Sequence, residues 1–377
     1  MTRTGLAIAS LVVCVALLAV GVVPSANRRY EGRTIRSPYL LAGSRLCGSD
    51  DAWTGPSSPP ACWRPYANTS PFNQPIPRGA RIAPNSSRIV RRLLGFGPLQ
   101  HLTAGDAGTA KDAGRAIYFN DARDPLFVVH CTRPWGTCPV EGLRVRIPDA
   151  ARVPGGADGH LSVVDSASGW EDDFWRVRSK PRGGGRLIVA WGGRTRIDGS
   201  GLGSYAVASR FGTLAGALRP EELQAGRIDH ALAISVRCDS GRFVYPASHS
   251  GWPCTAAGMS DRDAPAMGTR FRLAMTPAQI RALPIPASRK TILRAVARYG
   301  MYVADTGGTW AVIQVSGLVT LSFGLGDRWA DLARSVGASY WAPDHRYVID
   351  IRDGVDWRRR LRVIDPCVAE RTCRAHR

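Results

Sequence analysis

Three observations predict a mainly β fold, an antiparallel β-sandwich of jelly-roll-like form with a few flanking helices. Short apolar runs recur from about residue 115 onward, and Gly, Pro, Asp or Ser residues bound most of them. Regular helices do not separate these runs, which favours antiparallel sheets packed together over parallel winding. The chain has 377 residues, enough for one large domain behind an N-terminal leader.

The expected strands share a strand-like length and an enrichment in β-branched and aromatic residues. They lie at 116–119, 126–131, 143–148, 160–165, 173–178, 186–191, 230–238, 242–247, 269–275, 301–305, 310–315, 347–351 and 361–365.

The expected helices are few and carry recognisable end signals. Thr276 followed by Pro277 predicts a capped helix start, and Asp327 is expected to cap a later helix. Apolar residues at helical spacing end at Gly300 in a third segment. The four segments are 219–226, 276–284, 288–300 and 327–337.

The N-terminal part divides into a leader and an extended arm. Residues 1–26 place Arg3 before an apolar run and end in small residues, which is typical of a secretory signal peptide. The apolar run is also long enough for a single anchoring helix, so membrane contact is expected only if the leader is retained. Residues 27–80, rich in Pro and Ser, predict an arm that wraps over a β-sandwich domain at 81–377.

The cysteines behind the leader are even in number and fall into neighbouring pairs, which predicts local disulfides in an exported protein. No CxxC spacing occurs, so a zinc site is not expected. The expected pairs are Cys47–Cys62, Cys131–Cys138, Cys238–Cys254 and Cys367–Cys373.

The formal net charge is +20, and nearly all positive residues are Arg. Composition alone accounts for such a charge, but it also suits an anionic polysaccharide or an anionic envelope surface. Nucleic acid is not an expected partner, because no long basic run interleaves with aromatic residues and the protein is expected to be exported.

The hairpin at 158–178 carries the first candidate chemistry. Strand alternation places Asp158 and His160 on one side, and an Asp-x-His pair can orient a general base. In the second run, Glu171, Asp173 and Trp175 share a face, where two carboxylates would suit glycoside cleavage and the indole could stack on a sugar. An exposed acidic hairpin tip without function is the alternative.

Two further stretches add candidates. Asp229 and His230 precede an apolar strand and would supply a second acid or base, although a buried structural histidine is an equal alternative. The loop at 244–254 offers Tyr245, His249 and Trp252 as a platform for carbohydrate.

The Gly-rich stretch at 191–204 has no complete phosphate-binding motif and is expected to be a flexible flap, with Arg194 lining the substrate. Asp305 is expected to cap the turn "DTGG", and a role in the site is the alternative. No GxSxG or HExxH motif occurs, and neither a metal nor another cofactor is expected.

Several motifs together resemble those of a family of secreted, mainly actinobacterial proteins. They are "DGHLSVVD", "WEDDFW", "RIDHALAI", "YPA", "PAMGTRFRL" and "RAVARYGMYVADTGG", and the similarity spans most of the chain after residue 70. The resemblance implies secretion and a carbohydrate-related role, and it carries no catalytic residues over.

The sequence therefore predicts a secreted protein that cleaves glycosidic bonds of an extracellular or cell-wall polysaccharide. Hydrolysis is placed ahead of uronate elimination, because acids crowd the 158–178 hairpin and Asp229 adds another. Elimination would need a His or Tyr base with an Arg for the uronate carboxylate. A glycan-binding protein without catalysis is the alternative, and metal-dependent hydrolysis through Asp158, His160 and His230 is a third hypothesis.

Overall fold

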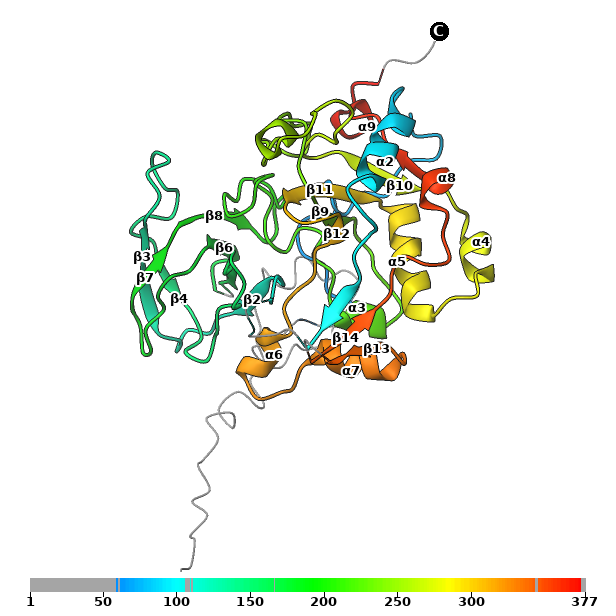
Figure 1. Ribbon diagram of the computed structural model, residues 1–377. Helices are drawn as coiled ribbons and strands as arrows, with labels where there is room; N and C mark the ends of the chain where they lie inside the picture. The colour runs from blue at the N-terminus through cyan, green and yellow to red at the C-terminus, as the bar shows by residue number, and fades with distance from the viewer. Residues whose placement is uncertain are drawn as a thin grey trace, which may run out of the picture.

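The computed structural model describes residues 59, 62–105, 109, 111–165, 167–342 and 345–373 of the chain (Figure 1). The expected leader, most of the expected arm, and Cys47 with its expected bridge lie outside these residues. In Figure 1 the strands β2 to β8 gather on the left, and most other elements gather on the right. We call the first group the strand lobe and the second the helix–sheet lobe.

The strand lobe consists of two sheets, with strand orders β2-β5-β6-β8 and β4-β3-β7. Both sheets contribute side chains to one hydrophobic cluster, for example Phe127 and Leu187 from one sheet and Val163 and Phe174 from the other. Helix α6 (Leu318–Ser322) adds Val319 to the cluster. The strands are β2 (Ala116–Phe119), β3 (Leu126–Cys131), β4 (Arg144–Arg146), β5 (Leu161–Val164), β6 (Trp170–Trp175), β7 (Gly185–Val189) and β8 (Trp191–Arg196).

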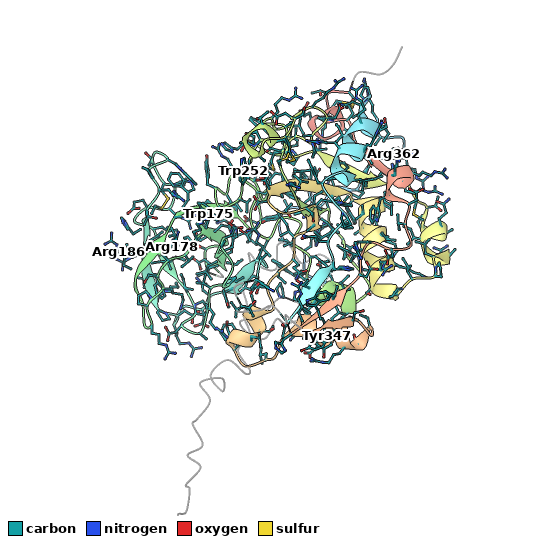
Figure 2. The ribbon with its side chains drawn as sticks, viewed as in Figure 1. Trp175, Arg178, Arg186, Trp252, Tyr347 and Arg362 are labelled. Carbon is teal, nitrogen blue, oxygen red and sulfur yellow. A yellow bond between two sulfur atoms is a disulfide. The ribbon has the colours of Figure 1, made fainter. Side chains whose placement is uncertain are left out.

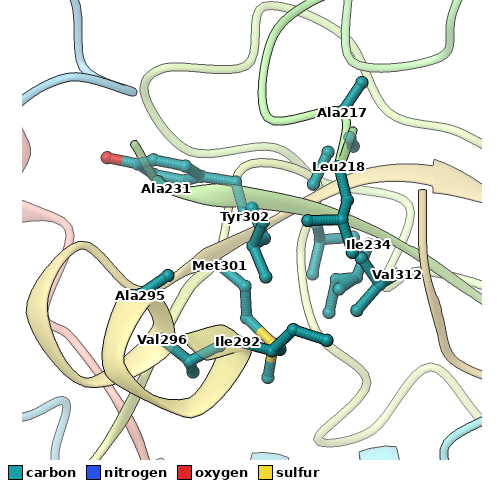
Figure 3. Packing of buried hydrophobic residues seen from close by; sticks show 14 of the residues in the cluster. Ala217, Leu218, Ala231, Ile234, Ile292, Ala295, Val296, Met301, Tyr302 and Val312 are labelled. Carbon is teal, nitrogen blue, oxygen red and sulfur yellow. The ribbon is translucent and has the colours of Figure 1, made fainter. Parts of the chain in front are cut away.

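The helix–sheet lobe is built on a five-stranded sheet of order β12-β9-β11-β10-β15, with a second sheet of order β1-β14-β13 beside it. Figure 3 shows Ile292, Ala295 and Val296 of α5 (Ala287–Arg298) turned toward Met301 of the sheet. The strands are β1 (Leu102–Ala104), β9 (Leu232–Val236), β10 (Arg270–Leu273), β11 (Met301–Thr306), β12 (Ala311–Val312), β13 (Ser339–Trp341), β14 (Arg346–Ile349) and β15 (Leu361–Val363).

Short helices cover the sheet edges and ends. Thr276 caps α4 by accepting a hydrogen bond from the Gln279 amide, and Asp327 caps α7 in the same manner, as expected. The remaining helices are α2 (Ser86–Leu94), α3 (Pro220–Gln224), the 3-10 helix η2 (Cys254–Ala257), α4 (Pro277–Ala282), α7 (Arg328–Ser335), α8 (Trp357–Arg360) and α9 (Cys367–Glu370).

The sheet β2-β5-β6-β8 lies between two hydrophobic clusters, because its strands alternate. Leu161 and Val163 of β5 point into the cluster of the strand lobe, whereas Val164 joins the larger cluster of the helix–sheet lobe. Glu171 pairs with Val164, and Asp173 pairs with Ser162, so both acids lie on the face turned to the larger cluster. We call this face the inner face.

The sheet-rich, mostly antiparallel architecture with few helices confirms the coarse prediction. Among the described strands the parallel pairs are β2–β5, β3–β7 and β9–β11. A jelly-roll sandwich is not confirmed, since no sheet of the described residues closes into a barrel.

The stretch 191–196 is a strand, β8, and the expectation of a flexible flap there was wrong. Its glycines are required by close packing, because a Cβ on Gly192 would lie 2.6 Å from the Asp173 carbonyl oxygen. A Cβ on Gly193 would lie 2.2 Å from the Tyr205 backbone nitrogen. The segment 204–214 therefore lies directly on β8, in the space that side chains would otherwise fill.

Three of the expected disulfides are present: Cys131–Cys138, Cys238–Cys254 and Cys367–Cys373. They close loops of 7, 16 and 6 residues, in agreement with local stapling. Such bridges are consistent with an extracellular protein. Within the described part of the chain, no helix has the length and apolar character needed to cross a bilayer.

Replacing Gly193 with alanine is expected to destabilise the fold. The added Cβ meets backbone, which can move only if the segment 204–214 lifts from β8, so we expect a loss of about 1–3 kcal/mol and a lower thermal unfolding midpoint. The matched control is Gly199→Ala, whose nearest neighbour would be the Arg196 Cβ at 3.1 Å. Equal unfolding midpoints in the two variants would contradict this packing.

Candidate functional site

A cavity of about 580 Å³ opens between the two lobes. Trp135, Trp175 and Trp191 line it from the strand lobe, so we call it the tryptophan cleft. The segment 205–210 lines a further part, and residues of the helix–sheet lobe complete the opposite side. The other lining residues are Thr137, Asp158, His160, Tyr205, Ala206, Val207, Ala208, Arg210, His249, Asp305 and Thr306.

The three tryptophans form one aromatic wall. Trp135 stacks on Trp175 with ring centroids 5.5 Å apart and planes 19° apart, and its ring lies 5.7 Å from Trp191. Trp175 and Trp191 are register partners on β6 and β8, so the sheet places them side by side. Trp135 comes from the disulfide loop 131–138 and is 59% exposed. Trp135 is therefore the exposed member of the wall, whereas Trp191 is 8% exposed.

Asp158 and His160 lie where the chain enters β5, at the edge of this wall. The Trp175 Nε1 donates a hydrogen bond of 3.1 Å to Asp158 Oδ1. Gly159 between them adopts a φ of +42°, which favours glycine. The structure thus brings together Asp158, His160, Trp175 and His249 of the residues singled out from the sequence.

His160 is a neutral imidazole at the cleft. It is 4% exposed, and burial first, then the charge of Arg115, lower its pKa well below the usual value. Its Nδ1 has no hydrogen-bond partner among the described residues. A buried ring nitrogen without a partner is costly, and a bound group that hydrogen-bonds to it would remove this cost.

Asp305 lines the same cleft from the end of β11, where the sequence predicted a turn cap with a role in the site as the alternative. Its Oδ1 does accept the Thr306 amide at 2.9 Å, and its Oδ2 lies 2.6 Å from Arg115 Nη2. The sequence held one signal for this position, a polar residue directly after the apolar strand and before Gly307. Two further residues that sequence reasoning missed, Tyr205 and Arg210, come from an irregular segment without a local pattern.

Arg210 brings a cation to the cleft. Its guanidinium lies 4.5 Å from the centroid of the Tyr205 ring, and no ion-pair partner for it occurs among the described residues. Its backbone has a φ of +62°, so the segment 205–210 turns sharply there. The charge of Arg210 is therefore available to an anionic group in the cleft.

A second cavity of about 360 Å³ adjoins the first. Asp158, Asp305 and Thr306 line both, and the second cavity is otherwise lined by groups such as Gln314 and Ser235. We call it the polar chamber. A long ligand could occupy the aromatic wall and the polar chamber at once, with the two carboxylates at the junction.

Glu171 and Asp173 share the inner face with the cleft residues, but neither lines the cleft. The Tyr66 hydroxyl donates to Glu171 Oε2 at 2.5 Å, and the Leu214 amide donates to Oε1 at 2.8 Å. The Ser204 hydroxyl donates to Asp173 Oδ2 at 2.6 Å. Burial raises the pKa of both carboxyls. The expected catalytic position of Glu171 is thus a buried contact beneath the segment 204–214.

Asp229 and His230 lie at the far end of the sheet. His230 Nε2 lies 2.9 Å from Glu222 Oε1, and the same carboxylate binds Arg219. His230 precedes β9, whereas Ser235 near the other end of β9 lines the polar chamber. Five residues of extended chain span roughly 16 Å, so His230 and Asp158 do not form one site. The sequence-based alternative, a buried structural histidine, agrees with this environment.

Three expected substrate contacts lie outside the cleft. Arg194 forms an ion pair of 3.0 Å with Asp172. Trp252 is 56% exposed and only its backbone amide approaches the cleft, by donating to Thr306 Oγ1. Tyr245 is also exposed and does not line the cleft. Figure 2 labels Trp175 and Trp252 near the junction of the two lobes.

The described residues contain no group of three or more His, Cys, Asp or Glu side chains arranged to hold a metal ion. In particular, Asp158, His160 and His230 do not converge.

No family model matches the chain, and neither a curated protein nor a solved structure matches it. The family resemblance drawn from motifs therefore stays a prediction.

Asp172 is expected to make the protein less stable as the pH rises. Burial raises its pKa to about 7, although Arg194 acts in the opposite direction. In the unfolded chain the carboxyl releases its proton near its usual value of 3.8. Between these values the folded state binds more protons, so the free energy of unfolding falls with pH by at most about 1.4 kcal/mol per pH unit.

The Asp172→Asn variant should lose this pH dependence. Urea unfolding at several pH values from 4 to 8 should show the variant gaining stability relative to the unchanged protein as the pH rises. The control is Asp198→Asn, because Arg196 lowers the pKa of Asp198 and no such relative gain is expected. Parallel pH profiles for Asp172→Asn and the unchanged protein would contradict the raised pKa.

Proposed function

We propose that the chain is a secreted glycan-active protein that binds a polysaccharide in the tryptophan cleft and cleaves a glycosidic bond there. The observation that carries this proposal is the meeting of an aromatic wall with His160, Asp158 and Asp305 in one cavity. Indole faces stack on sugar rings, while the polar groups bind hydroxyls and act on the bond. Secretion is supported by the leader and the disulfides.

The cleft favours elimination on an anionic glycan over hydrolysis. Carboxyls with raised pKa would suit a general acid, and none of those resolved lines the tryptophan cleft, although Asp327 lines the polar chamber. They are Glu171, Asp172, Asp173, Glu221, Asp239 and Asp327. The cleft instead offers a neutral histidine and the guanidinium of Arg210. This reverses the preference for hydrolysis, which depended on acids crowding the hairpin.

In the elimination, His160 takes the C5 proton of a uronate unit whose carboxylate pairs with Arg210. The C5–H electron pair forms the C4=C5 double bond, the C4–O4 bond breaks, and O4 takes a proton from a cleft donor or solvent. Electrostatic stabilisation of the carboxylate is what makes the C5 proton removable. His160 then returns its proton to solvent.

Hydrolysis by Asp158 and Asp305 is the second candidate, because both carboxylates line the tryptophan cleft and the polar chamber. Paired carboxylates on either side of a glycosidic bond are the usual machinery of hydrolases. A glycan spanning the two cavities would place a bond between them.

The purified protein is expected to cleave a uronate-containing polysaccharide, and His160→Gln should lower the rate about 100-fold or more with little change in thermal unfolding. The assay follows reducing ends and the ultraviolet absorbance of unsaturated uronate together, over neutral and uronic polysaccharides. The control is His345→Gln at an exposed position outside both cavities.

New reducing ends without the ultraviolet absorbance would show hydrolysis instead of elimination. Loss of those reducing ends in Asp158→Asn or Asp305→Asn would assign the hydrolysis to these two carboxylates. Glycan binding without any cleavage would contradict the proposed enzymatic activity and would support a glycan-binding protein. An unchanged rate in His160→Gln would exclude His160 as the base.

Trp135→Ala should weaken glycan binding roughly tenfold, because it removes an exposed stacking surface while leaving the sheet intact. The control is Trp341→Ala, an indole of similar exposure on β13, away from the cleft. Dissociation constants are measured by isothermal titration calorimetry. Cleavage is prevented either by using a cleavage-resistant oligosaccharide or by making the variants in the His160→Gln protein. Equal losses in the two variants would contradict the aromatic wall.

A further inference from the structure

The outer face of the sheet β4-β3-β7 carries a row of exposed arginines. Val128 of β3 pairs with Arg144 on one neighbouring strand and with Arg186 on the other. Residues directly opposite each other point to the same side of a sheet, so the three side chains form one row. Both arginines are exposed, and Val128 is 42% exposed. The inner partners Phe127, Val145 and Leu187 are buried, which fixes the arginines on the solvent side.

The row places two positive charges at a regular spacing. Adjacent strands lie about 4.8 Å apart, so Arg144 and Arg186 are anchored roughly 10 Å apart across β3. Arg146 extends the charge along β4 on the same side. Figure 2 labels Arg186 together with Arg178, whose backbone amide donates to the Ile188 carbonyl beside β7.

Glu141 is a carboxylate beside this row. The Cys131 amide, His130 and the charge of Arg186 lower its pKa, so Glu141 offsets part of the positive charge of Arg186. A shallow groove of about 370 Å³ runs here, lined in part by Val128, His130, Glu141 and Arg186. Arg144 does not line this groove, so the row of arginines extends beyond it.

The basic face continues into the tryptophan cleft. Strand β3 leads directly into the loop 131–138, where Arg133 lies over the rings of Trp135 and Trp175 at 5.3 and 5.9 Å. Arg176 lies over the other side of the wall, 4.8 Å from the Trp175 ring centroid. Positive charge is therefore present at each step from the outer face to the cleft.

We propose that this outer face, which we call the arginine face, is a docking surface for an anionic polysaccharide that is passed to the cleft. The choice of a polysaccharide rests on the proposed function of the cleft, and the charge of the polymer rests on the arginines themselves. Docking by charge raises the local concentration of polymer at the cleft and speeds association.

The composition of the face favours a polysaccharide over a membrane or a nucleic acid. Among the described residues of the face, Val128 is the large apolar side chain most exposed, and no Phe, Tyr or Trp side chain projects from β3, β4 or β7 on this side. Membrane binding in the interface uses apolar side chains that enter the bilayer, and single-stranded nucleic acids are bound by stacking on aromatic residues. A flat row of guanidiniums suits carboxylates along a hydrophilic polymer.

The test compares Arg144→Gln/Arg186→Gln with Arg358→Gln/Arg360→Gln, which removes the same charge from exposed positions on α8. Both are made in the full chain carrying His160→Gln, so that cleavage does not consume the polymer. Binding to immobilised polygalacturonate and to neutral dextran is measured at low and at physiological salt.

The expected result is a dissociation constant for polygalacturonate at least tenfold higher in Arg144→Gln/Arg186→Gln, and less than twofold changed in the α8 variant. The difference should shrink at higher salt, because exposed charges are screened, and dextran binding should not change. Equal weakening in both double variants would overturn the proposal by showing that the charge acts diffusely. Tighter binding, dependent on Arg144 and Arg186, to phosphatidylglycerol vesicles or duplex DNA would overturn it in favour of those partners.

A separate readout keeps the two proposals apart. With His160 intact, Arg144→Gln/Arg186→Gln should cleave a short uronate oligosaccharide at the unchanged rate, since such a ligand reaches only the cleft. If the polymer binds in an arginine-dependent manner but no glycan is cleaved, the docking surface is supported and only the enzymatic proposal is contradicted.

Discussion

The buried hydrogen bond from Tyr66 to Glu171 is the contact on which the arrangement of the cleft depends. It joins the N-terminal part of the described chain to β6, and the Leu214 amide joins the same carboxyl to the segment 204–214. Gly212 makes room for it, since a Cβ there would lie 2.3 Å from the Tyr66 hydroxyl. Leaving one partner of such a buried bond unsatisfied costs about 1–3 kcal/mol.

The cleft is the part of the inner face that this segment leaves uncovered. At Glu171 and Asp173 the segment 204–214 lies over β6 and buries both acids completely. At Trp175, on the same face, the cover ends, and Tyr205 and Arg210 form a rim instead. Strand β6 therefore both binds the segment 204–214, through Glu171 and Asp173, and lines the cleft, through Trp175. The cover by the segment 204–214 explains why Glu171 and Asp173 do not line the cleft.

Local pattern in the sequence was enough to predict most strands, the capped helices and three disulfides. It also singled out Asp158, His160, Trp175 and His249, which the structure brings into one cavity. Prediction from local pattern failed where contacts between distant parts of the chain determine the structure. Gly192 and Gly193 have the composition of a loop, yet they form a strand by pairing with β6, and the segment 204–214 fills the space over Gly193. Asp305 becomes a cleft residue only through the pairing of β11 with β9 and the approach of the strand lobe, and no local pattern encodes either.

The disulfide loop 131–138 determines when the aromatic wall of the cleft can form. Trp135 has no regular secondary structure to hold it; it is kept against Trp175 by the Cys131–Cys138 bridge, with Glu141 bracing the start of the loop at the Cys131 amide. A bridge of this kind forms in oxidising compartments and not in the cytosol. For the proposed function, the aromatic wall would therefore depend on oxidation of this bridge, because in a reduced chain no covalent link closes the loop that carries Trp135.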